Sequence, residues 1–95
     1  MKRIIDEYGT GKTYKLMKMA SETGGVIVCS NPYAMTEKAK AYGFTNLEFV
    51  SYSEFGHSTF HYKKYYIDDL EAFINHCFLE RVYGYTLSIE NWSNL

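Results

Sequence analysis

A run of four apolar, mostly β-branched residues, Val26-Ile27-Val28-Cys29, indicates the fold class of this chain. A strand with one solvated face alternates apolar and polar residues, whereas a strand covered on both faces is apolar throughout. The run has the length of a strand and is far too short to span a membrane. It therefore predicts a central strand of a parallel sheet that is covered on both sides, as in α/β proteins.

Strand and helix patterns alternate along the rest of the chain. We predict five strands, at Lys2–Ile5, Val26–Cys29, Leu47–Tyr52, Lys64–Asp68 and Tyr85–Ile89. We predict three helices, at Lys12–Glu22, Pro32–Tyr42 and Asp69–Val82. This order predicts a single domain over residues 1–95, an α/β fold of three layers in which a mostly parallel five-stranded sheet is flanked by about three helices.

The ends of the second helix carry specific signals, whereas one later stretch carries none. Asn31 is placed to cap that helix, Pro32 fits its first position, and Gly43 falls where a C-terminal cap belongs. The stretch Ser53–His61 has no clear pattern. A parallel crossover usually takes about a dozen residues or more. Either a single helical turn bridges this stretch, or one of the strands beside it runs antiparallel.

Composition and charge narrow the classes of function. Ten Lys and Arg residues against eleven Asp and Glu residues give a net charge of -1, which excludes a strongly basic face for gripping duplex DNA. The N-terminal residues lack the apolar segment of a secretory signal. We therefore expect a cytoplasmic protein that does not contact membranes, with Cys29 and Cys77 as reduced thiols.

A glycine-rich turn joins the first predicted strand to the first predicted helix. It reads Gly9-Thr10-Gly11-Lys12-Thr13. Backbone N–H groups at such a turn converge on a phosphate, a lysine pairs with the β- and γ-phosphates, and a hydroxyl binds Mg²⁺. The turn resembles the Walker A motif of the P-loop NTPases, in the Gly-Thr-Gly-Lys-Thr form common in AAA-type and helicase-like ATPases.

An acidic pair ends the fourth predicted strand. The segment Tyr65-Tyr66-Ile67-Asp68-Asp69 is apolar and then acidic, and it resembles a Walker B motif. The resemblance implies that Asp68 holds Mg²⁺ through water and that Asp69 orients or activates the attacking water. Asp69 is also placed to cap the helix that follows it.

The resemblance to P-loop NTPases implies a domain that binds ATP or another NTP with Mg²⁺. The loop Gly9–Thr13 would bind the nucleotide, Thr13 and Asp68 would hold the metal, and Lys12 and Asp69 would serve catalysis. Members of this family are usually much larger. We therefore expect slow hydrolysis by the chain alone and activation by a protein partner or by homo-oligomer assembly, and the small size suggests a phage or mobile element.

Two other functions fit parts of the sequence. Asp6 stands where the first Walker A glycine falls, and its charge would weaken nucleotide binding. A degenerate P-loop domain with ten tyrosines would instead act by binding another protein. The segment Tyr62–Tyr66 interleaves aromatic and basic residues, which can stack single-stranded bases. Alternate burial along a strand explains the same residues, and the net charge favours that interpretation over nucleic-acid binding.

Overall fold

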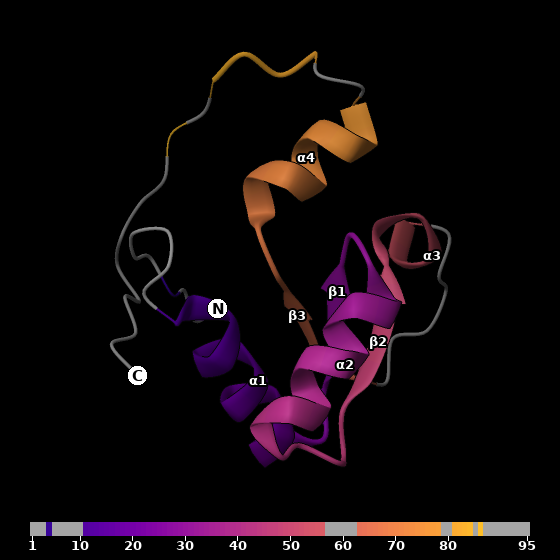
Figure 1. Cartoon of the computed structure of the whole chain (residues 1–95). Coiled ribbons are helices and arrows are strands. Elements are labelled where there is room, and N and C mark those ends of the chain that lie inside the picture. The colour runs from indigo at the N-terminus through magenta and orange to yellow at the C-terminus, as the bar shows by residue number, and fades with distance from the viewer. Residues whose placement is uncertain (1–3, 5–10, 57–62, 79–80, 85, 87–95) are drawn as a thin grey trace.

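The computed structural model describes residues 4, 11–56, 63–78, 81–84 and 86, and within them the chain forms four helices and a parallel sheet (Figure 1). The strands are β1 (Val26–Cys29), β2 (Glu48–Ser51) and β3 (Tyr65–Ile67), in the sheet order β2-β1-β3. The helices are α1 (Lys12–Thr23), α2 (Pro32–Tyr42), α3 (Tyr52–Gly56) and α4 (Leu70–Phe78). The predicted α/β class and parallel sheet are confirmed.

Strand β1 is the central strand, as its uninterrupted apolar run predicts. It pairs in parallel with β2 on one side and with β3 on the other, and all four of its residues are buried. Because β2 and β3 both run parallel to β1, the link between them is a parallel crossover. The short helix α3 lies in that link, so the helical-turn alternative is correct and the antiparallel one is wrong.

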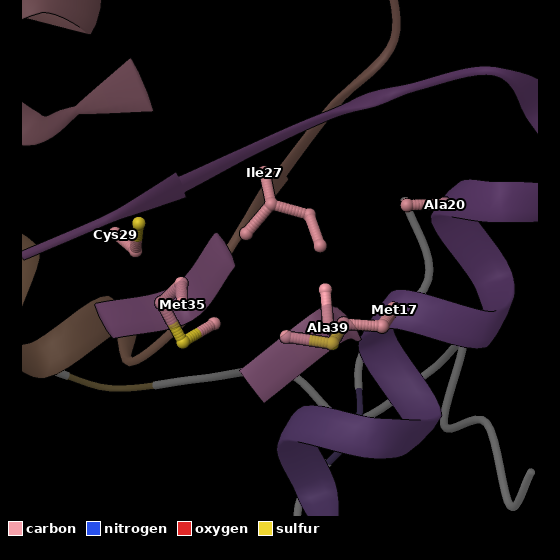
Figure 2. Packing of buried hydrophobic residues seen from close by; sticks show 6 residues of the cluster. All are labelled: Met17, Ala20, Ile27, Cys29, Met35 and Ala39. Carbon is pink, nitrogen blue, oxygen red and sulfur yellow. The ribbon is translucent and has the colours of Figure 1, made fainter. Parts of the chain in front are cut away.

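Helices α1 and α2 pack on one face of the sheet. Figure 2 shows side chains from α1, β1 and α2 pointing toward one another in this core, which consists of Met17, Ala20, Ile27, Cys29, Met35 and Ala39. Burying a Met or Ile side chain stabilises a fold by about 1.5–3 kcal/mol. Leu16 of α1 is only half-buried. The neighbouring Met17 has no exposed surface, because it faces the sheet and α2 together.

Both ends of α2 follow the sequence signals. The Asn31 side chain accepts a hydrogen bond from the Ala34 N–H at 3.1 Å, and Pro32 opens the helix. Gly43 closes it with φ 88°, in the left-handed region that favours glycine. The predicted caps and the predicted bounds of this helix are confirmed.

A capping box starts α3, so Tyr52 belongs to this helix and not to the strand Leu47–Tyr52 that the sequence predicted. The Ser51 hydroxyl accepts from the Glu54 N–H at 3.1 Å, and the Glu54 carboxylate accepts from the Ser51 N–H at 3.1 Å. This pair ends β2 at Ser51, so Tyr52 becomes the first residue of α3. Phe55 of α3 packs against Tyr65 of β3, with ring centroids 4.9 Å apart.

The contacts of β3 place the helices on two faces of the sheet. Tyr66 packs against the core formed with α1 and α2. Tyr65 packs against α3. Successive side chains of a strand point to opposite faces, so α3 lies on the face away from α1 and α2.

The last predicted helix is shorter than Asp69–Val82. Helix α4 covers Leu70–Phe78, and the described residues 81–84 are not helical. In Figure 1, α4 lies beyond the end of the sheet rather than against its face. Its apolar side is poorly covered, since Leu70 is 41% exposed and Phe78 is 55% exposed. Only its side with Phe73 and His76 packs on rings of α3, and a short helix with so little cover has little to extend it.

The outer predicted strands lie almost wholly outside the described residues. Of Lys2–Ile5 only Ile4 is described, and of Tyr85–Ile89 only Thr86, and neither is in a strand. Both cysteines are free thiols, with Cys29 buried and Cys77 exposed. None of the helices in the described ranges is long and apolar enough to cross a membrane.

Candidate functional site

A left-handed glycine stands directly before the first residue of α1. Gly11 precedes the helix with φ 82° and ψ 23°, a left-handed conformation that a glycine adopts without steric cost. No side chain of the described residues caps this helix end. The first N–H groups of a helix carry positive partial charge, and a left-handed residue followed by helical ones forms a concave arrangement of N–H groups.

Thr13, in the first turn of α1, contacts the acidic pair at the end of β3. Its hydroxyl donates to Asp68 Oδ1 at 3.3 Å, across 55 positions of the chain. The Asp68 N–H donates to the Val28 carbonyl at 2.9 Å. That bond continues the pairing of β1 with β3 and fixes where Asp68 leaves the sheet. The two motif-like segments therefore meet at the carboxyl end of a parallel sheet, where α/β folds bind ligands.

Asp68 is half-buried among charged and polar groups. Burial raises the pKa of this carboxyl above its usual value, and the neighbouring Asp69 adds to the rise. The hydrogen bond from Thr13 and the positive charges of Lys38 and Lys12 act in the opposite direction on the same pKa. Asp68 thus lies within the field of two lysines that come from different helices. Sequence reasoning missed Lys38, because only the packing of α2 brings its charge to Asp68.

The raised pKa of Asp68 predicts a change in stability with pH. When the folded-state pKa of a carboxyl is raised, its protonated form favours folding, and this stabilisation is lost as pH rises through that pKa. Asp68→Asn, which is always neutral, is therefore expected to unfold a few degrees higher than wild type at pH 7. The difference should vanish as pH falls to about 3. Thermal unfolding followed by circular dichroism in Mg²⁺-free buffer measures this, and equal midpoints at pH 7 would contradict it.

Asp69 caps α4 in a left-handed conformation. Its φ is 62°, and it is the single non-glycine residue with positive φ among those that the structure describes. Its Oδ1 accepts a hydrogen bond from the Ala72 N–H at 3.1 Å. Asp and Asn tolerate this conformation better than other side chains. The predicted capping role is confirmed, and the predicted role of Asp69 with an attacking water stays a prediction.

Tyr52 holds the backbone of the acidic pair, and sequence reasoning missed it. Its hydroxyl donates to the Asp68 carbonyl at 2.7 Å and lies 3.3 Å from the Asp69 carbonyl. Burial, with the nearby Asp69 and Asp68 carboxylates, raises the pKa of Tyr52 to about 12, so the hydroxyl stays a donor. The sequence signal that could have found it is the capping box of Ser51 and Glu54, which predicts a helix start and therefore a change in the direction of the chain at Tyr52.

Several predicted site residues lie outside the described residues. They are Asp6, Gly9 and Thr10. Of the predicted nucleotide-binding loop, the structure describes Gly11, Lys12 and Thr13, and it brings Thr13 to Asp68.

The described residues of the segment Tyr62–Tyr66 include side chains that contact other parts of the fold. Lys63 forms an ion pair with Glu48 at 2.6 Å. Tyr65 packs on α3, and the Tyr66 hydroxyl hydrogen-bonds to the Thr23 hydroxyl at 2.7 Å. All three residues of β3 are half-buried, so the predicted alternation of buried and solvated residues along this strand is wrong, although both tyrosines make contacts within the fold. Tyr62 lies outside the described residues.

The oxygen donors of the site match the chemistry of Mg²⁺. This ion takes one or two carboxylates and completes its shell with waters and phosphate oxygens. Asp68 supplies a carboxylate and Thr13 a hydroxyl 3.3 Å from it. Within the described ranges, no group of three or more His, Cys, Asp and Glu side chains could hold a metal ion.

Comparison with known proteins assigns no family to this chain. No protein-family model matches it, and neither does any curated protein or solved structure.

Proposed function

We propose that this chain is a small P-loop-type domain that binds ATP or another NTP together with Mg²⁺. The observation that carries the proposal is the 3.3 Å hydrogen bond from Thr13 to Asp68. It joins the hydroxyl of a Gly-Lys-Thr turn to the first carboxylate of the acidic pair. Gly11 adds the left-handed backbone at the start of α1, which supports close approach of a phosphate.

Each residue has a distinct role in this proposal. Lys12 offers a mobile positive charge to the β- and γ-phosphates, and the first turn of α1 offers N–H groups. Thr13 and Asp68 hold Mg²⁺ between them, directly or through water. When bound, the ion neutralises charge on the phosphates. Lys38 adds positive charge at the Asp68 side of the site, where it lowers the pKa of Asp68.

Slow hydrolysis belongs to the proposal as a second, weaker activity. Asp69 is the candidate to orient the attacking water, but its Oδ1 already accepts the Ala72 N–H. A carboxylate committed to a helix cap is a poor general base unless the cap opens. Activation by a protein partner or a homo-oligomer remains part of the proposal, as do cytoplasmic location and the five-stranded form of the sheet.

A calorimetric titration with ATP tests the proposed function. We expect wild type to bind in the micromolar range with Mg²⁺ and at least about tenfold more weakly in EDTA, a difference of about 1.4 kcal/mol. In Asp68→Asn the affinity should be the same with and without Mg²⁺. Asp69→Asn is the matched control, because Asn also caps helices and tolerates positive φ. It should keep the Mg²⁺ response.

Two results would count against this function. The first is a folded wild-type protein that binds no ATP at millimolar concentration with Mg²⁺. The second is Mg²⁺-dependent binding that survives in Asp68→Asn. The first result would favour a degenerate P-loop domain that acts through a protein partner.

A further inference from the structure

Tyr52 is tied to the acidic pair through backbone atoms. Its hydroxyl lies 2.7 Å from the Asp68 carbonyl and 3.3 Å from the Asp69 carbonyl, so one proton serves two successive peptide groups. The Tyr52 side chain is 5% exposed. Its ring contacts Phe73 and His76 of α4, with centroids 5.4 Å and 5.7 Å apart. The hydroxyl is therefore a fixed point rather than a mobile surface group.

The turn that Tyr52 contacts is under backbone strain. Asp69 has φ 62°, a conformation that side chains other than glycine rarely adopt. Such a conformation persists only where surrounding contacts hold it. Four contacts hold this turn in the structure. The Asp68 N–H donates to the Val28 carbonyl, and the Phe73 N–H donates to the Asp69 carbonyl. The Asp69 carboxylate accepts from the Ala72 N–H, and the Tyr52 hydroxyl donates to the two carbonyls. Tyr52 is the contact that comes from outside the sheet and α4.

The direction of this turn decides where the Asp68 side chain points. The carboxylate reaches Thr13 on the far side of the strand end. A change in the peptide between Asp68 and Asp69 would rotate the carboxylate away from the hydroxyl. Groups that orient a metal ligand from behind typically change metal affinity about 10- to 100-fold when they are removed.

We propose that Tyr52 is a positioning residue, whose hydroxyl holds the Asp68–Asp69 turn so that the Asp68 carboxylate faces Thr13. The effect of Tyr52 on Mg²⁺-dependent ATP affinity rests on the function proposed above, whereas its effect on the geometry of the turn does not. Tyr52→Phe removes the hydroxyl and keeps the ring. Tyr66→Phe is the matched control, since it removes a hydroxyl that hydrogen-bonds to Thr23 at the opposite end of α1 from Thr13.

The first measurement uses NMR on the nucleotide-free protein. The Ala72 amide, which donates to Asp69, should exchange with solvent about tenfold faster in Tyr52→Phe. The Thr13 methyl resonance should shift in the same variant. Tyr66→Phe should change neither signal. If both signals in Tyr52→Phe are the same as in wild type, the proposal is overturned, whatever the ATP titrations show.

The second measurement is the ratio of ATP affinity with Mg²⁺ to that in EDTA. Tyr52→Phe should lower this ratio about tenfold and leave the affinity in EDTA unchanged, while Tyr66→Phe keeps the wild-type ratio. An unchanged ratio in Tyr52→Phe, with a Mg²⁺ response in wild type, would overturn the proposal. If wild type itself lacks a Mg²⁺ response, the proposed function fails, and the NMR signals alone decide whether Tyr52 holds the turn.

Discussion

Lys12→Ala is expected to weaken Mg-ATP binding roughly 10- to 150-fold while the protein stays folded. Hydrogen bonds to charged groups contribute about 1.5–3 kcal/mol, and this range corresponds to that loss in affinity. Lys12 opens the first turn of α1, directly after the left-handed Gly11. Its charge also acts on Asp68, whose pKa it lowers. The removal of Lys12 therefore affects both the phosphate and the metal side of the proposed site.

Lys18→Ala is the control for this prediction. Lys18 lies on the same helix and is exposed, but it is more than a turn away from the N-terminus of α1. The Lys18→Ala variant should bind Mg-ATP with the affinity of wild type. Calorimetric titration of the three proteins, with unfolding curves to show that each is folded, completes the test. An affinity in Lys12→Ala within about twofold of wild type would contradict the P-loop interpretation and favour an interaction module.

Gly25→Ala is expected to destabilise the fold by about 3 kcal/mol, the largest effect on stability that we predict. A Cβ at this position would lie 2.4 Å from Tyr66 Cε2 and 2.9 Å from the Lys64 carbonyl oxygen. The ring would have to leave its place against the α1 and α2 core, where its hydroxyl meets Thr23. The Lys64 carbonyl also accepts the Val26 N–H at 2.8 Å. Relief of the clash therefore costs core packing or sheet pairing.

Gly56→Ala separates this clash from the general effect of replacing a glycine. Among the residues that the structure describes, nothing lies within 4 Å of a Cβ added at Gly56, and its φ is not positive. Its stability should stay within about 0.5 kcal/mol of wild type. Urea unfolding of the three proteins measures the difference, which is large for a domain whose total stability is of the order of 5–15 kcal/mol. Equal midpoints for Gly25→Ala and wild type would contradict the prediction.

Local signals explain the parts of the fold that the sequence predicted well. Asn31, Pro32 and Gly43 bound α2 as predicted, because capping depends on atoms within a few residues of the helix end. The apolar run of β1 predicted a strand buried on both faces, because burial on both sides leaves no position for a polar side chain. The same kind of signal, Ser51 with Glu54, was available for α3 and was not used.

Part of the site was also predictable. The spacing of Lys12 and Thr13 after Gly11, and of Asp68 at the end of a strand, predicted which residues could meet. The structure brings Thr13 to Asp68. It also shows that Asp69 caps α4, one of the two roles that the sequence left open. The capping box of Ser51 and Glu54 indicated a helix start at Tyr52, but no pattern indicated that its hydroxyl meets the acidic pair, and none pointed to Lys38.

The sequence by itself determined the kind of element at α1, α2, α4 and the three described strands, the ends of α2 and the central place of β1, because each depends on neighbours in the chain. Only the tertiary structure decided the sheet order β2-β1-β3, the parallel crossover through α3 and the contact of Gly25 with Tyr66. It also decided that Tyr52 reaches the carbonyls of the acidic pair. These contacts join residues that are far apart in the chain, and their geometry depends on strand register and on how the helices pack. No short window of sequence contains that information.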